Sequence, residues 1–278
     1  MSITRERSKV VFERLDRDLV KLSSKAVPEN VHRFRTSTRR VQTLLQELSP
    51  QRKQKKLLKL LGRLRKRAGK VRDLDVQLAA LRSLRFPQEP RRKTQLMHRL
   101  IELRGEQEKK LGKALDKATV REVRKKLKRA GKETDAEATR DPLAVARRML
   151  QQIEAADATV TEAVLHQYRI FGKRARYAAE FAAKSPEASH FISELKRMQD
   201  ALGDWRDWLT LTQSASELLG DVRESPLVAE LHNVTGAKFR HAVTVLSHLR
   251  TKLGASAENK GQAPARAAKA AQTAVSAA

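Results

Sequence analysis

The sequence contains no cysteine, which excludes disulfide bonds and thiolate metal sites. Aromatic residues make up only 4% of the chain, too few for the interleaved base stacking of many single-stranded nucleic-acid binders. No segment approaches the roughly 20 apolar residues of a membrane span, and the charged N-terminal stretch lacks the apolar run of a secretory signal. We therefore expect a soluble, cytoplasmic protein with no membrane partner.

Acidic residues are few compared with basic ones. The 278 residues include 59 Lys and Arg against 32 Asp and Glu, a formal net charge of +27. This imbalance brings no benefit for folding, but it favours polyanionic partners. The composition therefore predicts a protein that binds something acidic, and the chain is long enough to bury the core of one large domain or two small ones.

Glycine and proline are also sparse, and apolar residues recur at intervals of three and four without sustained alternation. This pattern predicts an all-α fold. The few helix breakers divide the chain into eight expected helices, near 3–25, 29–48, 51–85, 91–130, 142–157, 160–184, 187–219 and 226–253. From Gly254 onward the sequence is Ala-rich and lacks a core-forming face, so we expect a disordered tail over 254–278.

An internal repeat with a shift of 134 residues relates the two halves of the chain. The shift aligns His32, Arg35, Arg39 and Arg40 with His166, Arg169, Lys173 and Arg174, and Leu61, Arg63, Gly69, Arg72 and Asp73 with Leu195, Arg197, Gly203, Arg206 and Asp207. We therefore predict two four-helix halves, 1–131 and 141–253, that pack about a pseudo-twofold axis. Because basic positions are repeated as well as apolar ones, we interpret the charge pattern as functional.

The basic residues around His32 share one face of their predicted helix. At 100° per residue they lie within about 80° of His32, with the apolar positions opposite. The alternative is a solvated charged face, but such faces usually mix signs, and neither copy places an acid among its cations. Because Ile170 and Phe181 border the second row, we expect the rows to line a groove, where a low dielectric strengthens attraction to an anion.

The two histidines allow a structural and a functional interpretation. Either ring could be hydrogen-bonded at a helix junction and serve packing alone. If they are functional, the surrounding arginines should lower the pKa of His32 and of His166, leaving neutral rings that donate one N–H to an anionic oxygen. A bound polyanion would then raise the pKa of each ring again.

The third predicted helix of each half carries the remaining shared charges. Eleven basic residues and no acid occur from Arg52 to Arg72, whereas the second copy, LKRMQDALGDWRDWL, has fewer, so the first half should bind an anion more strongly. We expect Asp73 and Asp207 each to orient an arginine of an adjacent helix; catalysis would need a partner acid or a metal. Gly69 and Gly203 are expected to permit close helix contact, because a mid-helix glycine otherwise costs about 1 kcal/mol relative to alanine.

The motifs VHRFRTSTRR and LHQYRIFGKRARY, followed by GKVRDLDV and GDWRDWL, resemble the CHAD family, the conserved-histidine α-helical domain, over about 5–253. The resemblance implies two four-helix bundles around a basic groove or channel that binds inorganic polyphosphate. It also implies that the protein lies on polyphosphate granules and that it has no catalytic activity, cofactor or metal. Carried onto this chain, it marks as polyphosphate-binding His32, Arg35, Arg39, Arg40, Arg63, Arg72, His166, Arg169, Lys173, Arg174, Arg197 and Arg206.

Two departures and two rival functions accompany this resemblance. Lys173 replaces a second arginine and loses the bidentate fork, and Asp75 is matched by Leu209. An RNA- or DNA-binding protein is the main alternative, supported by the net charge and by the basic run from Arg121 to Lys132, although aromatic residues are scarce. A polyphosphate hydrolase or kinase would need a glycine-rich phosphate loop or an acid cluster for magnesium, and the sequence has neither.

Overall fold

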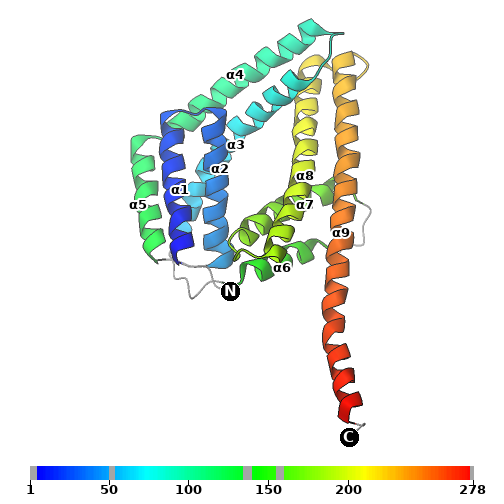
Figure 1. The fold of residues 1–278 in the computed structure, drawn as a ribbon. Coiled ribbons are helices and arrows are strands. Elements are labelled where there is room, and N and C mark those ends of the chain that lie inside the picture. Colours follow the sequence, from blue (N-terminus) through cyan, green and yellow to red (C-terminus); the bar gives the residue numbers. More distant parts are fainter. Residues whose placement is uncertain (1–4, 50–53, 134–139, 155–159, 276–278) are drawn as a thin grey trace.

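A computed structural model describes residues 5–49, 54–133, 140–154 and 160–275, and every regular element in these ranges is helical. The elements are α1 (Arg5–Ser24), α2 (Pro28–Thr43), the short π-helix η1 (Leu44–Leu48), α3 (Lys55–Ser83), α4 (Pro90–Ala114), α5 (Lys117–Glu133), α6 (Pro142–Glu154), α7 (Glu162–Ala179), α8 (Pro186–Leu219) and α9 (Pro226–Val275) (Figure 1). The all-α prediction is confirmed. The expected helix ends at 3, 51 and 157 lie outside the described residues.

Proline and capping side chains explain where several helices begin. Proline occupies the first turn of α2, α4 and α8, where a missing N–H costs nothing. The Ser185 hydroxyl caps α8 by accepting from the backbone N–H of Ala188 at 3.0 Å, and Thr161 caps α7 by accepting from that of Val164 at 3.3 Å. These local signals are readable in the sequence, so the predicted starts of these helices lie close to the observed ones.

The segment expected as one helix over 91–130 is two helices, α4 and α5. The break falls at Leu115 and Asp116, where the Asp116 carboxylate accepts the backbone N–H of Thr119 at 2.7 Å and caps α5. Apolar periodicity continues across this break and hides it in the sequence. As a result α5 packs against α1 and α3.

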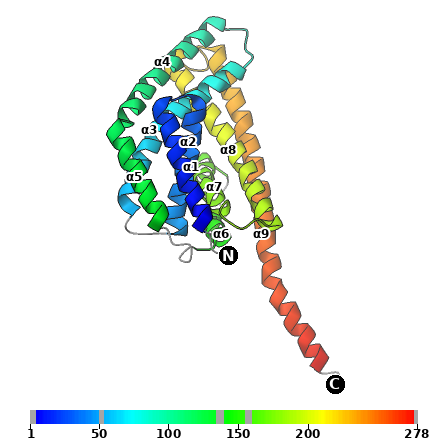
Figure 2. The same ribbon diagram turned by 60° about the vertical axis from the view of Figure 1, so that its left-hand side comes forward.

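The last helix continues past Gly254, where we expected it to end and a disordered tail to begin. Its backbone is helical to Val275, and in both Figures 1 and 2 this end of α9 extends away from the other helices. Alanine is the strongest helix former, so an Ala-rich segment can continue a helix without a core-forming face. Residues 276–278 of the predicted tail lie outside the described residues.

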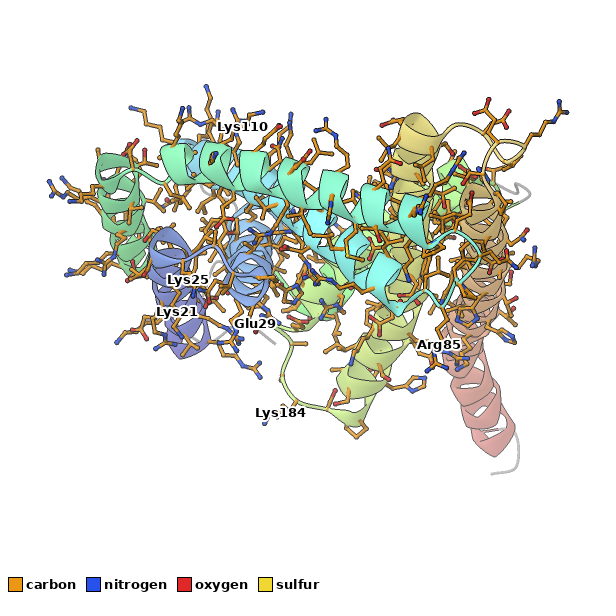
Figure 3. The ribbon with its side chains drawn as sticks, turned by 90° about the horizontal axis from the view of Figure 1, so that it is seen from above. Lys21, Lys25, Glu29, Arg85, Lys110 and Lys184 are labelled. Carbon is orange, nitrogen blue, oxygen red and sulfur yellow. The ribbon has the colours of Figure 1, made fainter. Side chains whose placement is uncertain are left out.

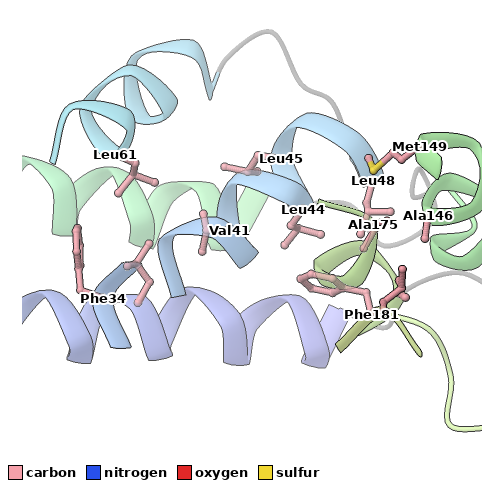
Figure 4. Packing of buried hydrophobic residues seen from close by; sticks show 14 of the residues in the cluster. Phe34, Val41, Leu44, Leu45, Leu48, Leu61, Ala146, Met149, Ala175 and Phe181 are labelled. Atoms are coloured by element: carbon pink, nitrogen blue, oxygen red, sulfur yellow. The ribbon is translucent and has the colours of Figure 1, made fainter. Parts of the chain in front are cut away.

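Two apolar clusters hold the described helices together. The larger draws on both halves of the chain, and Figure 4 shows Phe34 and Val41 of α2 in the same cluster as Ala175 of α7 and Phe181. The smaller joins the later parts of α3 and α8 to the starts of α4 and α9. The core is thus shared between the halves, and the arrangement of two four-helix bundles about a pseudo-twofold axis stays a prediction.

Candidate anion-binding site

Charged residues of α3 and α8 lie between the two apolar clusters. Along α3, Arg72 and Asp73 come after the last buried residue of the larger cluster and before the first of the smaller one. Along α8, Arg206 and Asp207 hold the same place. Because α3 contacts α8, the repeat brings equivalent charged residues from both halves into one region.

The first half contributes cations from α2 and α3. Nη2 of Arg35, on α2, lies 3.9 Å from Oδ1 of Asp73, on α3. Burial lowers the pKa of Arg35 to about 10; the Asp73 carboxylate opposes this shift, whereas Arg39, Arg65 and Arg72 add to it. These four arginines are therefore close enough to repel one another.

The second half contributes cations from α7 that face the first half. Burial lowers the pKa of Lys173 to about 7; Arg169 and Arg39 lower it further, as does Arg35, and Asp207 opposes the shift. Burial also lowers the pKa of Arg169, and Arg39 again adds to the effect. Arg39 of the first half therefore lies among cations of both halves.

The repeated aspartates lie within the same group of charges. Burial raises the pKa of Asp207 to about 6; Lys173 and Arg169 oppose the shift, and Asp73 of the other half adds to it. We call the nine residues linked in this way the central cluster. Its members are Arg35, Arg39, Arg65, Arg72, Asp73, Arg169, Lys173, Arg206 and Asp207.

Two arginines of the central cluster each have a buried hydrogen-bond donor without an acceptor. Nε of Arg65 and Nε of Arg169 are buried and have no hydrogen-bond partner among the described residues. A buried donor without a partner costs about 1–3 kcal/mol, and the oxygen of a bound anion would satisfy it. The equivalent residue in the second half is Gln199, and its side-chain amide is hydrogen-bonded at both ends. Its Nε2 donates to the Gly172 carbonyl and its Oε1 accepts from Nε of Arg176, each at 2.8 Å.

Gly69 gives Arg35 its place in the central cluster. A Cβ at Gly69 would collide with Nη1 of Arg35, so the guanidinium of α2 lies directly against the backbone of α3. At the equivalent Gly203 a Cβ would meet nothing within 4 Å. The predicted close approach is therefore present at Gly69, where it positions a cation, and the prediction for Gly203 is wrong.

His32 is at the edge of the central cluster and His166 is exposed on α7. The pKa of His32 is lowered, first by partial burial of the ring and then by the charge of Arg72, while Glu29 opposes the shift. This direction confirms the prediction for His32, although the arginines are the second cause and not the first. The expectation for His166 stays a prediction.

The structure separates Arg40 and Arg174 from the other basic residues of their rows. Nε of Arg40 lies 2.8 Å from Oε2 of Glu180, and Nη2 of Arg174 pairs with Oε1 of Glu47. Each arginine thus pairs with an acid of the other half. Consecutive residues on a helix differ by 100°, and packing then decides the outcome: Glu180 at the end of α7 pairs with Arg40, whereas Arg39 lies among the cations of the central cluster. Our prediction placed all of them on one groove.

Arg63 and Arg197 are exposed, and no described contact joins them to the central cluster. In contrast, Arg65 belongs to the cluster, and the sequence prediction missed it. Arg65 and Arg72 are seven residues apart and so share a face of α3, which is the signal that could have revealed it. The repeat concealed it, because the second copy has Gln199 there.

Asp75, which the second half lacks, has a structural partner. Its buried carboxylate accepts from Nε of Arg104 on α4 at 2.9 Å, and Nη2 of Arg104 donates to the Ala26 carbonyl at 2.8 Å. The carboxylate also raises the pKa of Arg104, against the effect of burial. Through Arg104, Asp75 therefore holds α3, α4 and the connection between α1 and α2 together, apart from the central cluster.

Comparison with known proteins shows the family to which the chain belongs. The family model of the CHAD domain matches residues 12–216, more than half of the chain. The chain therefore belongs to the CHAD-domain family. No curated protein matches it in sequence.

Two solved structures share the fold. The crystal structure of the CHAD domain from the plant Ricinus communis is 20% identical, with a TM-score of 0.62 over 91% of this chain and 92% of that one. PptA from Streptomyces chartreusis is 18% identical, with a TM-score of 0.63 over 91% of this chain and 99% of that one. At these identities the likeness shows the fold alone.

Membrane-spanning helices and metal-binding groups are both absent from the described residues. None of the helices there is both long and apolar enough to cross a membrane. Within the same part of the chain, no group of three or more His, Asp or Glu side chains could hold a metal ion.

Proposed function

We propose that the chain binds inorganic polyphosphate at the central cluster, without catalysis. The observation that carries this proposal is the convergence of seven basic side chains from both halves on one region with only two acids. Buried cations that repel one another are costly unless an anion joins them. Membership of the CHAD-domain family supports the same function.

Polyphosphate has the chemistry that this arrangement suits. It is a flexible chain with about one negative charge per phosphate unit and no base to recognise. Arginine forks form paired bonds to such oxygens, and the ammonium of Lys173 adds a compact charge. The unsatisfied Nε atoms of Arg65 and Arg169 would donate to phosphate oxygens. Binding would release condensed counterions, so affinity should fall steeply with salt, by analogy with nucleic acids.

The proposed binding requires no turnover. Asp73 and Asp207 lie among cations, where they orient and partly neutralise the basic side chains. In the cell, such a binder would target or organise polyphosphate granules. Phosphate release from long chains in the presence of magnesium or manganese would show instead that the protein is an enzyme.

Nucleic-acid binding is the second candidate, and the outer surface of α5 favours it. Exposed cations without an ion pair to a described residue occur there at Arg121, Lys125, Lys128 and Lys132. A competition experiment at equal phosphate concentration separates the two functions. Single-stranded RNA should fail to displace polyphosphate; effective displacement would show that the protein binds polyanions in general.

The decisive test compares two double variants with the same loss of charge. Arg39→Ala with Lys173→Ala removes one central cation from each half, whereas Lys109→Ala with Lys110→Ala removes two exposed cations of α4, where Lys110 lies at the outer edge (Figure 3). Charge-assisted contacts contribute about 1.5–3 kcal/mol each, so the central variant should bind at least about 100-fold more weakly. The titrations should use fixed salt and a pH of about 6, where Lys173 is charged.

The outer variant should change affinity only slightly, because its lysines are exposed and solvated. Equal losses in the two variants would show that net charge alone governs binding, and the proposed site would then be wrong.

A further inference from the structure

Two pockets lie beside the ion pairs Arg40–Glu180 and Arg174–Glu47. The first has a volume of about 700 Å³ and is lined by Arg7, Arg14, Arg40 and Glu180, with Val11 and Phe181 as apolar wall. The second has a volume of about 240 Å³ and is lined by Arg140, Arg148, Arg174 and Glu47, with Val145 and Met149. Each pocket therefore combines three arginines with one glutamate. No residue of the central cluster lines either pocket.

The same 134-residue repeat relates three lining positions of the two pockets. It carries Val11 onto Val145, Arg14 onto Arg148 and Arg40 onto Arg174. The acids exchange places between the halves, because Glu180 of the second half lines the first pocket and Glu47 of the first half lines the second. The same residues recur at these positions in two halves that otherwise differ in sequence. This recurrence indicates that the pockets are functional.

Two of the three arginines in each pocket differ in how they are held. Arg40 and Arg174 are held in place by their glutamates and by neighbouring rings, with Arg40 5.8 Å from the ring centroid of Tyr177 and Arg174 5.6 Å from that of Phe171. In contrast, Arg14 and Arg148 are exposed and form no ion pair or hydrogen bond with any residue that the structure describes. Each pocket thus has an oriented guanidinium beside a free one.

We propose that these pockets are a pair of sites for a compact phosphoryl oxyanion, one in each half. The glutamate offsets the charge of Arg40 or Arg174, so the unpaired Arg14 or Arg148 keeps each pocket positive. Guanidinium forks match phosphate oxygens bidentately, and the apolar wall lowers the local dielectric, which strengthens the attraction. The inference is independent of the proposed function, because it uses none of the central-cluster residues.

Pyrophosphate is the probe, and the test counts sites at low salt by calorimetry while recording the Nε–Hε signals of the arginines by NMR. We expect pyrophosphate to shift the signals of Arg14 and Arg148. Arg14→Gln should weaken binding at the first pocket at least tenfold and leave the second, and Arg148→Gln should do the reverse. Both side chains are exposed and unpaired, so the variants should unfold at the temperature of the parent protein.

Arg17→Gln is the matched control. Arg17 is exposed on the same helix as Arg14, it lines neither pocket, and its repeat equivalent is the neutral Gln151. The control should keep both pyrophosphate sites. The inference is overturned if Arg17→Gln weakens binding as much as Arg14→Gln, or if pyrophosphate shifts only central-cluster signals such as that of Arg39. Long-chain polyphosphate binding is measured separately, so either proposal can fail without the other.

Discussion

The two halves hold the same motif in different surroundings. In the first half, 64% of the Asp73 side chain is exposed, and its carboxylate lies 3.9 Å from the guanidinium of Arg35. In the second half, Asp207 is half-buried near Lys173 and Arg169, and burial raises its pKa to about 6. The difference shows that the repeat supplies equivalent residues, whereas tertiary packing sets how deeply each of them is buried.

The consequence is a division of roles within the central cluster. The first half supplies arginines, which keep their charge at physiological pH. The second half supplies Lys173 in place of an arginine, and its pKa of about 7 makes its charge depend on pH. The first half also has Arg65 where the second has the fully bonded Gln199. The expectation that the first half binds an anion more strongly stays a prediction.

Substitution of Gly69 and of Gly203 by alanine should give the largest difference in polyphosphate affinity between the two halves. Gly69→Ala puts a methyl group where Nη1 of Arg35 lies, so Arg35 must move and polyphosphate affinity should fall more than about tenfold, the equivalent of one charge-assisted contact. Gly203→Ala meets nothing within 4 Å; it should leave affinity unchanged and stabilise the protein by up to about 1 kcal/mol. Titration and urea unfolding of both variants measure these effects, and equal affinities would contradict this account of Arg35.

Raising the pH should weaken polyphosphate binding through the second half. Burial lowers the pKa of Lys173 from 10.5 to about 7 and raises that of Asp207 from 3.8 to about 6. At pH 5 the lysine is charged and most of Asp207 is neutral, whereas at pH 8 most of the lysine is neutral and Asp207 is charged. The cluster therefore loses positive charge across this range. Above pH 7 the bound anion must reprotonate Lys173, so affinity should fall by up to about tenfold per pH unit.

Lys173→Arg tests whether Lys173 causes this pH dependence, because an arginine stays charged from pH 5 to pH 8. The variant should retain its affinity between pH 7 and pH 8, where the parent protein loses affinity. Titrations at constant ionic strength measure the effect. If the parent and the variant lose affinity in parallel above pH 7, the titrating group is not Lys173.

The smallest predicted effect concerns the ion pairs Arg40–Glu180 and Arg174–Glu47, which link the two halves of the chain. The side chains of Arg40 and Glu180 are 23% and 19% exposed, whereas those of Arg174 and Glu47 are 46% and 20% exposed. Arg40→Gln should lower the free energy of unfolding by about 1–2 kcal/mol and Arg174→Gln by about 0.5 kcal/mol, since solvent screens the more exposed pair. Lys9→Gln, which breaks an exposed pair within α1, is the control and should have almost no effect. Equal losses at Arg40 and Arg174 would mean that burial does not distinguish the two pairs.

Most of the helices and part of the site could be predicted from the sequence. Helix starts follow from proline and capping residues, which act locally. The rows around Arg35 and Arg169 follow from the repeat. The break at Asp116 and the cation Arg65 were missed, the first because apolar periodicity continues through it, and the second because only one copy of the repeat carries it.

The separation of Arg39 from Arg40 could not be predicted from the angle along the helix alone. The two side chains are 100° apart, which is compatible with one broad groove or with two separate environments. The position of α7 decides between these, because Glu180 lies at the end of α7 and pairs with Arg40. The same holds for Arg174 and Glu47.

By itself, the sequence determined an all-helical chain with a duplicated set of basic residues and a large excess of positive charge, because periodicity, helix breakers and charge are local properties of the chain. Only the tertiary structure decided which cations from the two halves meet, which of them pair with acids, and which are buried deeply enough for their pKa values to shift. Those outcomes depend on distances and on exclusion of water between residues more than a hundred positions apart, and helix packing alone sets both.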